Sequence, residues 1–283
     1  MTLIAAAGGD RVAYVTLTEI EWEQVQRVWD LLEEGNTERA RIELGPLLEK
    51  RPGHADLRIV DAAVSLDEGE AERALRALAG AERSADPALF FHLRGAVQYE
   101  LGRFDRARAD AERALAVRPD SANTHDLLGR ILDHLGDEAG AREHREEAQA
   151  LDPEDFPAPL EVPDEEFDRL VEKSVSELPP RVREHLNELP VMVEPLPRHE
   201  IIASEQPPLS PDILGLFVGR DMLERRHDDL PAGPGAIFLF RKNLLRVCRD
   251  REELANEVRI TVQHEVGHLL GLDEDDLEQW GLA

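Results

Sequence analysis

Apolar residues recur at helical spacing over residues 251–270, close to the end of the chain. Asp250 precedes this stretch, and with Glu253 three positions later it forms the pattern of an N-cap and its capping-box partner. Gly271 stands where a left-handed C-cap ends a helix. The spacing therefore predicts an amphipathic helix with one side against a core. The apolar positions on that side are Leu254, Val258, Val262, Val266 and Leu269.

Two short apolar runs upstream of this helix predict β-strands. Residues 190–197 are β-branched and apolar between prolines, and residues 236–240 are continuously apolar after Gly-Pro-Gly. Residues 165–178 have helical spacing and end before a Pro-Pro pair, which predicts a helix. Residues 209–219 contain two glycines and show no clear period. We expect a loop or a short helix there.

The N-terminal half is repetitive. Glycine and alanine each recur four times at spacings of 34, 33 and 34 residues, and a proline follows near the end of each unit. This period resembles the tetratricopeptide repeat, a helix–turn–helix unit with small residues where its helices cross. The resemblance implies four repeats over residues 21–154. The recurring positions are Gly35, Gly69, Gly102 and Gly136, then Ala40, Ala74, Ala107 and Ala141, then Pro52, Pro87, Pro119 and Pro153.

Tetratricopeptide arrays present a concave groove, so the resemblance implies a peptide or protein partner. The Asn and Lys set that clamps a C-terminal carboxylate in chaperone-binding arrays is not found in this sequence, so such a tail is not the expected partner. For each groove position an ordinary solvated side chain is the alternative. The groove-facing candidates at the usual first-helix positions are His92, Tyr99, Asn123, Asp126, Arg130 and His134.

A change in composition separates the repeats from the rest of the chain. Residues 155–164 are rich in proline and acid, which predicts a stiff, extended linker. Residues 165–283 then form a second domain, and residues 1–20 form a short strand or an irregular cap before the repeats. Two domains agree with the length of 283 residues.

Charge and cysteine content limit the classes of partner and the compartment. The formal net charge of −27 argues against binding to nucleic acid or to an anionic membrane, because both would be repelled. The single cysteine, Cys248, cannot form an internal disulfide, and we interpret it as a buried, small apolar residue. The chain has no run of about twenty apolar residues, and residues 1–9 lack the pattern of a signal peptide. We expect a soluble cytoplasmic protein.

The helix at residues 251–270 carries the motif His264-Glu265-Val266-Gly267-His268. Residues four apart lie on one face of a helix, so His264 and His268 can aim both imidazoles at one zinc ion. Glu265 is turned away by one residue, where it can act as the general base toward a water molecule. The motif therefore indicates zinc-dependent hydrolysis.

A catalytic zinc usually takes three protein ligands, so a third remains to be assigned. Glu274 is the first choice, because it stands where the metzincin pattern places its third histidine, and zinc binds carboxylates readily. Asp275 is the second choice. The other candidates are Asp273 and Asp276 in the same acidic run, and His199 and His227 upstream.

The segment from about Pro190 to Ala283 resembles the small bacterial zincin-like metallopeptidases. The resemblance lies in residues 190–194, 213–219, 235–240 and 258–268, and in Gly271-Leu-Asp-Glu-Asp-Asp276. It implies a compact α/β domain with an active-site helix, a few strands, zinc and peptidase activity. In zincins a strand beside the motif helix often lies along the substrate; residues 236–240 are either that strand or a plain core strand.

The expected fold is thus an α-helical tetratricopeptide solenoid followed by a small α/β (α+β) zincin-like metallopeptidase domain. The expected function is a zinc peptidase whose repeats recruit or regulate a protein substrate. Two alternatives stay open: a repeat adaptor with an inactive or structural zinc domain, and a peptidase whose repeats serve only stability. An intact Glu265 argues against the adaptor, because a structural zinc site needs no general base. Arg220, Arg225 and His227 are candidates for stabilising the oxyanion.

Overall fold

A computed structural model describes residues 16–178, 180–186, 189–219 and 235–269 of the chain. Internal packing divides the chain into two compact units, one up to Val97 and the other from Gln98 onward. The second unit therefore contains the later repeats together with the C-terminal domain. The domain borders inferred from composition stay predictions, since packing follows a different division.

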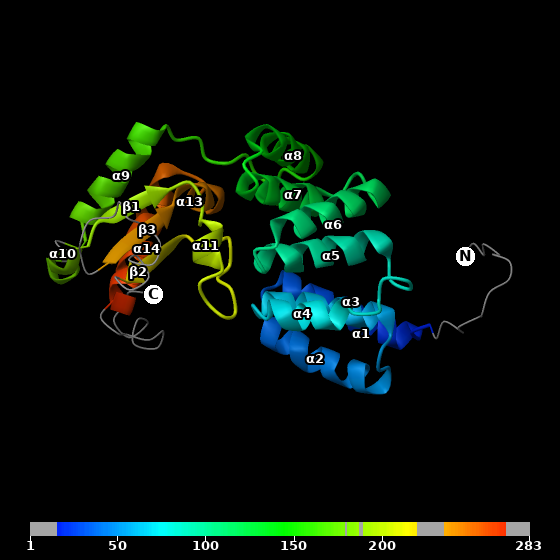
Figure 1. Ribbon diagram of the computed structural model, residues 1–283. Helices are drawn as coiled ribbons and strands as arrows, with labels where there is room; N and C mark the ends of the chain where they lie inside the picture. The colour runs from blue at the N-terminus through cyan, green and yellow to red at the C-terminus, as the bar shows by residue number, and fades with distance from the viewer. Residues whose placement is uncertain (1–15, 179, 187–188, 220–234, 270–283) are drawn as a thin grey trace. The chain divides into compact units, whose positions relative to one another are not determined.

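The N-terminal half folds as four consecutive helix pairs, which confirms the repeat prediction (Figure 1). The four turn glycines have φ values of 70°, 74°, 65° and 78°, a left-handed backbone that favours glycine. The four recurring alanines are each 0% exposed, as close packing of paired helices requires. The pairs are α1 (Glu19–Glu33) with α2 (Thr37–Lys50), α3 (Ala55–Asp67) with α4 (Ala71–Leu78), α5 (Pro87–Glu100) with α6 (Phe104–Val117), and α7 (Ala122–His134) with α8 (Glu138–Leu151).

Residues 155–163 of the predicted linker contain no helix or strand, and its last residue, Asp164, begins helix α9 (Asp164–Ser176). Helix α10 (Pro180–Leu186) follows after the Pro-Pro pair. Of the predicted N-terminal cap, only residues 16–20 are described, and they lead into α1. Residues 1–15 lie outside the described part of the chain.

The C-terminal domain contains a sheet of three strands in the order β1-β3-β2, built from β1 (Val191–Glu194), β2 (Gly215–Gly219) and β3 (Gly235–Phe240). Strand β1 is parallel to β3, and β2 is antiparallel to it. Every residue of the central strand β3 is buried, so the core-strand interpretation of residues 236–240 is right. The alternative, a substrate-binding edge, is wrong because both edges of β3 are already paired.

The expectation of a loop or short helix over residues 209–219 is wrong for its last five residues, which form β2. Leu216, Phe217 and Val218 pair with β3, and the glycines on either side allow close packing in place of ending the strand. This gives the sheet an edge strand that the sequence pattern did not predict.

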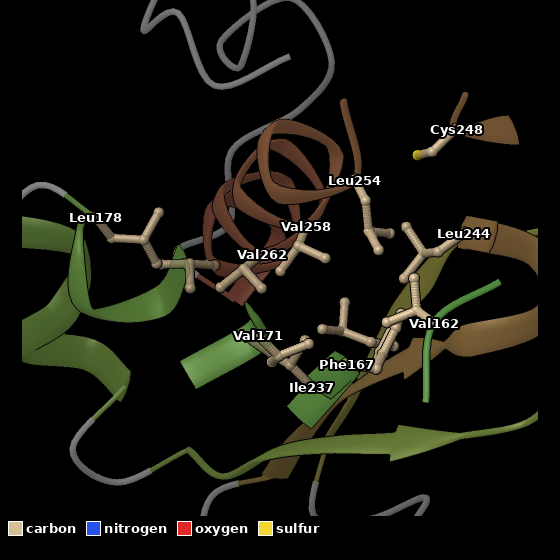
Figure 2. Close-up of a cluster of buried hydrophobic side chains, with 12 residues drawn as sticks. Val162, Phe167, Val171, Leu178, Ile237, Leu244, Cys248, Leu254, Val258 and Val262 are labelled. Atoms are coloured by element: carbon tan, nitrogen blue, oxygen red, sulfur yellow. The ribbon is translucent and has the colours of Figure 1, made fainter. Parts of the chain in front are cut away.

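Helix α14 (Arg251–Leu269) buries four of the five residues of the predicted stripe, Leu254, Val258, Val262 and Val266, against the rest of the domain (Figure 2), and the side chain of the fifth, Leu269, lies outside the described residues. Leu254, Val258 and Val262 are each 0% exposed. They pack on α9, on β3 and on helix α13 (Arg241–Val247), which joins β3 to α14. The domain is thus held together by one face of α14. The main partners in this cluster are Phe167, Val171, Ile237, Leu239 and Leu244.

Cys248 follows α13 and is buried in the same cluster, as expected of a small apolar residue. Burial, together with the negative charges of Glu257 and Glu253, raises the pKa of its thiol to about 11. The thiol therefore stays protonated near neutral pH and is a poor nucleophile.

Among the described helices, none has the length and apolar character needed to cross a membrane.

The start of α14 depends on Asp250, whose Oδ1 accepts hydrogen bonds from the backbone N–H groups of Glu252 (2.8 Å) and Glu253 (3.0 Å). We expect Asp250→Ala to lower the free energy of unfolding by roughly 0.5–2 kcal/mol, because two N–H groups at the helix start lose their acceptor. Urea unfolding measures the change. Glu252→Ala alters the charge of the same turn without removing the cap and should cost less than half as much; equal losses would contradict the capping role.

Candidate functional site

The zinc motif lies in the last two turns of α14. His264 is half-buried, and it lies on the side of the helix away from the core stripe. His268 follows one turn later on the same helix, although its side chain lies outside the described residues. Two imidazoles one turn apart on one face fit the nitrogen ligands that zinc prefers. The roles of His264 and His268 as zinc ligands stay predictions.

The third ligand is not found within the residues that the structure describes, which hold no group of three or more His, Cys, Asp or Glu residues able to bind a metal ion. Glu274 and the other acids of residues 273–276 lie outside the described part, as do Arg220, Arg225 and His227. His199 begins helix α11 (His199–Ile202) and packs edge-on against the ring of Phe104, with centroids 6.3 Å apart. Glu274 thus stays a prediction.

Glu265 is held at the edge of the sheet. Its side chain is 7% exposed, and its Oε2 accepts a hydrogen bond of 2.6 Å from the backbone N–H of Phe217 in β2. Phe217 faces Ile237 across the antiparallel pair, yet its N–H points to Glu265 and away from β3. Phe217 therefore occupies a non-hydrogen-bonded position of the ladder, and both of its backbone polar groups lie on the outer edge of β2.

Strand β2 lies directly on helix α14 one turn before Glu265. A Cβ added at Gly215 would come within 2.4 Å of Thr261 Cγ2 and 3.0 Å of the Phe238 carbonyl oxygen. Only a residue without a side chain fits such a contact. Gly215 and the hydrogen bond of Glu265 thus join the strand and the helix at two adjacent points.

Among the described residues, no strand pairs with the outer edge of β2. Backbone groups alternate in direction along a strand, so those of Gly215 and Gly219 point to the same outer side as those of Phe217. Gly219 has no side chain to obstruct another backbone, whereas the space beside Gly215 is filled by Thr261 of α14. Glu265 lies at the centre of this edge.

Four of the six groove candidates meet one another in the second unit, around Asp212. The Tyr99 hydroxyl donates to Asp212 Oδ1 (2.6 Å), and Arg130 Nη1 donates to Asp212 Oδ2 (2.6 Å). Arg130 also pairs with Asp126 at 3.0 Å. The ring of His134 lies 5.7 Å from that of Tyr99. These groove positions are thus in contact with the chain's own residues.

The remaining two candidates lie elsewhere. Asn123 is exposed near the start of α7, and His92 is half-buried on the part of α5 that belongs to the first unit.

His134 stacks on Phe104 with ring centroids 4.4 Å apart, and burial lowers its pKa to about 4. The imidazole of His134 is therefore neutral at physiological pH. The partner-binding role of all six residues remains a prediction.

Residues 186–282 match the zincin-like metallopeptidase family. The C-terminal domain is a zincin-like domain. The match covers the sheet, α11, α13 and α14, and it ends one residue before the C-terminus of the sequence. The helix with the zinc motif and the edge strand beside it therefore both belong to the zincin-like domain.

Comparison of the whole chain adds little to this family match. No curated protein matches the chain. The crystal structure of MamA is 19% identical with a TM-score of 0.37, over 44% of this chain and 73% of that one. The structure of PilF from Pseudomonas aeruginosa is 18% identical with a TM-score of 0.43, over 94% of this chain and 98% of that one. The repeat fold accordingly rests on the helix pairs, their glycines and their alanines.

Sequence reasoning missed Phe217, Gly215 and Asp212. The signal for β2 was three consecutive apolar residues between glycines, which is too short to establish a period. Asp212 stands in a proline-containing stretch, and its partners lie 113 and 82 positions away. No local pattern identifies such long-range partners.

We expect Gly215→Ala to destabilise the zincin-like domain by roughly 1–3 kcal/mol, because the new methyl group overlaps Thr261. Adding Thr261→Ser removes the methyl group in the way and should recover part of the loss. Chemical unfolding of the single and double variants measures both effects. Gly219→Ala is the matched control, since among the described residues its Cβ would meet only Phe217 ring carbons, at 3.8 and 3.9 Å. Equal losses at the two glycines would contradict the close approach at Gly215.

Proposed function

We propose that the protein is a zinc-dependent peptidase in which Glu265 is the general base. The observation that carries the proposal is the position of Glu265, buried between the motif helix and the edge strand and held by the Phe217 N–H at 2.6 Å. A structural zinc site has no need of a fixed carboxylate beside its ligands, whereas hydrolysis does. The zincin-like family match supports the same chemistry.

His264, His268 and a third residue, Glu274 by preference, would hold the zinc ion. When bound, the ion supplies the Lewis acidity that brings a water molecule toward a pKa of about 7. Glu265 would take a proton from the attacking water and pass it to the leaving amine. The hydrogen bond from Phe217 keeps the carboxylate oriented for this step, because it fixes one of its oxygens.

The proposed substrate is a peptide in extended conformation that pairs with the outer edge of β2. The outward-facing backbone groups of Gly215 and Gly219, with the carbonyl oxygen of Phe217, supply donors and acceptors on both sides of Glu265, while the Phe217 N–H binds Glu265 itself. Recognition by backbone pairing depends little on side chains, so flanking pockets would set the sequence preference. The repeats would bring protein substrates to this edge or regulate access to it.

Glu265→Gln should leave fold and zinc content unchanged and lower kcat by roughly 100- to 10,000-fold, because the amide accepts the Phe217 hydrogen bond but no proton from water. A peptide library screened on the wild type supplies a substrate, and steady-state kinetics then compares the variants. Glu252→Gln makes the same chemical change at an exposed position of α14 and should retain full activity. Turnover by Glu265→Gln at the wild-type rate would exclude the general-base role.

His264→Ala should abolish binding of zinc, and Glu274→Ala should weaken it by about 10-fold or more, because each removes a ligand. Asp276→Ala changes charge in the same acidic run and should have little effect. Competition with a chelator measures all three affinities. The reverse ranking of the two acids would move the ligand along the run. No effect from any of the four acids would point to His199 or His227.

A further inference from the structure

We infer that Asp212 is a positioning residue: the third and fourth repeats hold its carboxylate, and its backbone fixes the strand on which Glu265 rests. The inference rests on the proposed role of Glu265 as general base. All of the residues involved belong to the second compact unit. The later repeats would then serve as part of the scaffold of the catalytic site.

The repeats contact Asp212 through two side chains from different helices. Tyr99 of α5 donates to one carboxylate oxygen and Arg130 of α7 to the other, each at 2.6 Å. Tyr99 is 1% exposed, and burial followed by the charge of Asp212 raises its pKa well above the ordinary value, so it remains a donor. Burial raises the pKa of Asp212, but the charges of Arg130 and Arg246 outweigh it, so this pKa lies below its ordinary value and the carboxylate stays ionised.

The charge of Asp212 is needed because two cations meet there. Arg130 approaches from the repeats, and Arg246 of α13 donates to Asp212 Oδ1 at 3.2 Å. Each cation has a second acidic partner, Asp126 at 3.0 Å for Arg130 and Asp133 at 3.5 Å for Arg246. Without the Asp212 carboxylate, the two guanidinium groups would lose the anion they share and repel each other.

The backbone on both sides of Asp212 is fixed to the zincin-like domain. Asn243 is 1% exposed, and its Nδ2 donates to the carbonyl oxygens of Pro211 (2.9 Å) and Ile213 (2.8 Å). The Leu214 carbonyl oxygen accepts a hydrogen bond of 2.8 Å from the N–H of Phe240, and β2 begins at the next residue. A shift of Asp212 is therefore passed directly into the first residues of β2.

The start of β2 is the part of the strand that touches the catalytic helix. Gly215 lies against Thr261, and Phe217 donates to Glu265 two residues later. Because that hydrogen bond ties Glu265 to the strand, displacement of β2 changes the orientation of the carboxylate. The path runs from Asp212 through the four intervening residues to Phe217.

Amide hydrogen exchange of the full-length protein, read residue by residue by NMR, tests the inference without requiring activity. Asp212→Asn should speed exchange of the Phe217 amide by about tenfold or more, because a hydrogen bond to a charged group is worth enough to hold the strand closed. The exchange rates of the Val258 and Val262 amides, in the core of α14, should stay within about twofold of their wild-type values. These two amides serve as the reference, because general destabilisation would speed their exchange as much as that of Phe217.

Tyr99→Phe removes one hydrogen bond to Asp212 and keeps the ring, so it should shift Phe217 in the same direction by roughly threefold. This variant decides the matter if Asp212→Asn does not fold. Glu166→Gln is the control, because it breaks the ion pair with Arg251 at the start of α14 and does not touch β2. Unchanged exchange at Phe217, or an equal change at Val258 and Val262, would overturn the inference.

A peptidase assay separates this inference from the proposed function. Asp212→Asn should lower kcat about tenfold or more and change KM and zinc affinity little, because it misplaces the base and removes no ligand. If the wild type cleaves no peptide but Phe217 exchange responds, the proposed function fails and the coupling stands. If the wild type is active and kcat of Asp212→Asn is unchanged, Asp212 has no positioning role.

Discussion

Strand β2 and helix α14 approach each other so closely that no side chain fits between Gly215 and Thr261. This contact fixes the distance at which Glu265 meets the backbone of Phe217, and so determines where the carboxylate lies. The apolar stripe holds the opposite side of α14 in place, since Leu254, Val258 and Val262 pack against the core. The site is thus the product of one helix packed on two sides.

Buried charge specifies where the zincin-like domain meets the later repeats. The Asp133 side chain is 0% exposed and lies within 2.5 Å of Arg145, 2.8 Å of Lys242 and 3.5 Å of Arg246. Such networks add little net stability, because the cost of desolvation offsets the attraction between the charges. Any other packing of these elements would, however, leave a buried charge unpaired. In a chain with 33 basic and 60 acidic residues, three cations surround this one buried carboxylate.

The sequence predicted those parts of the fold that depend on periodic local patterns. The recurring glycines and alanines predicted the helix pairs, and the apolar stripe through Val258 and Val262 predicted the buried face of α14. Strand β2 escaped prediction because its five residues show no alternation, and its stability comes from pairing with β3. The role of Asp212 was not predicted either, because it depends on a partner that is distant in sequence: Tyr99 is 113 positions away. At the site, the motif indicated two ligands and a base but not the strand that orients the base.

These contacts also bear on partner binding by the repeats. Tyr99 and Arg130 are groove candidates, and both bind Asp212, Tyr99 through its hydroxyl and Arg130 through its guanidinium. A partner that took these two side chains would have to displace Asp212, and so would act on β2 and Glu265. By linkage, a substrate that stabilised β2 in place would weaken that partner by the same factor. His92 belongs to the first unit and stands outside this competition. A partner that leaves the proposed substrate edge undisturbed would therefore bind through the earlier repeats.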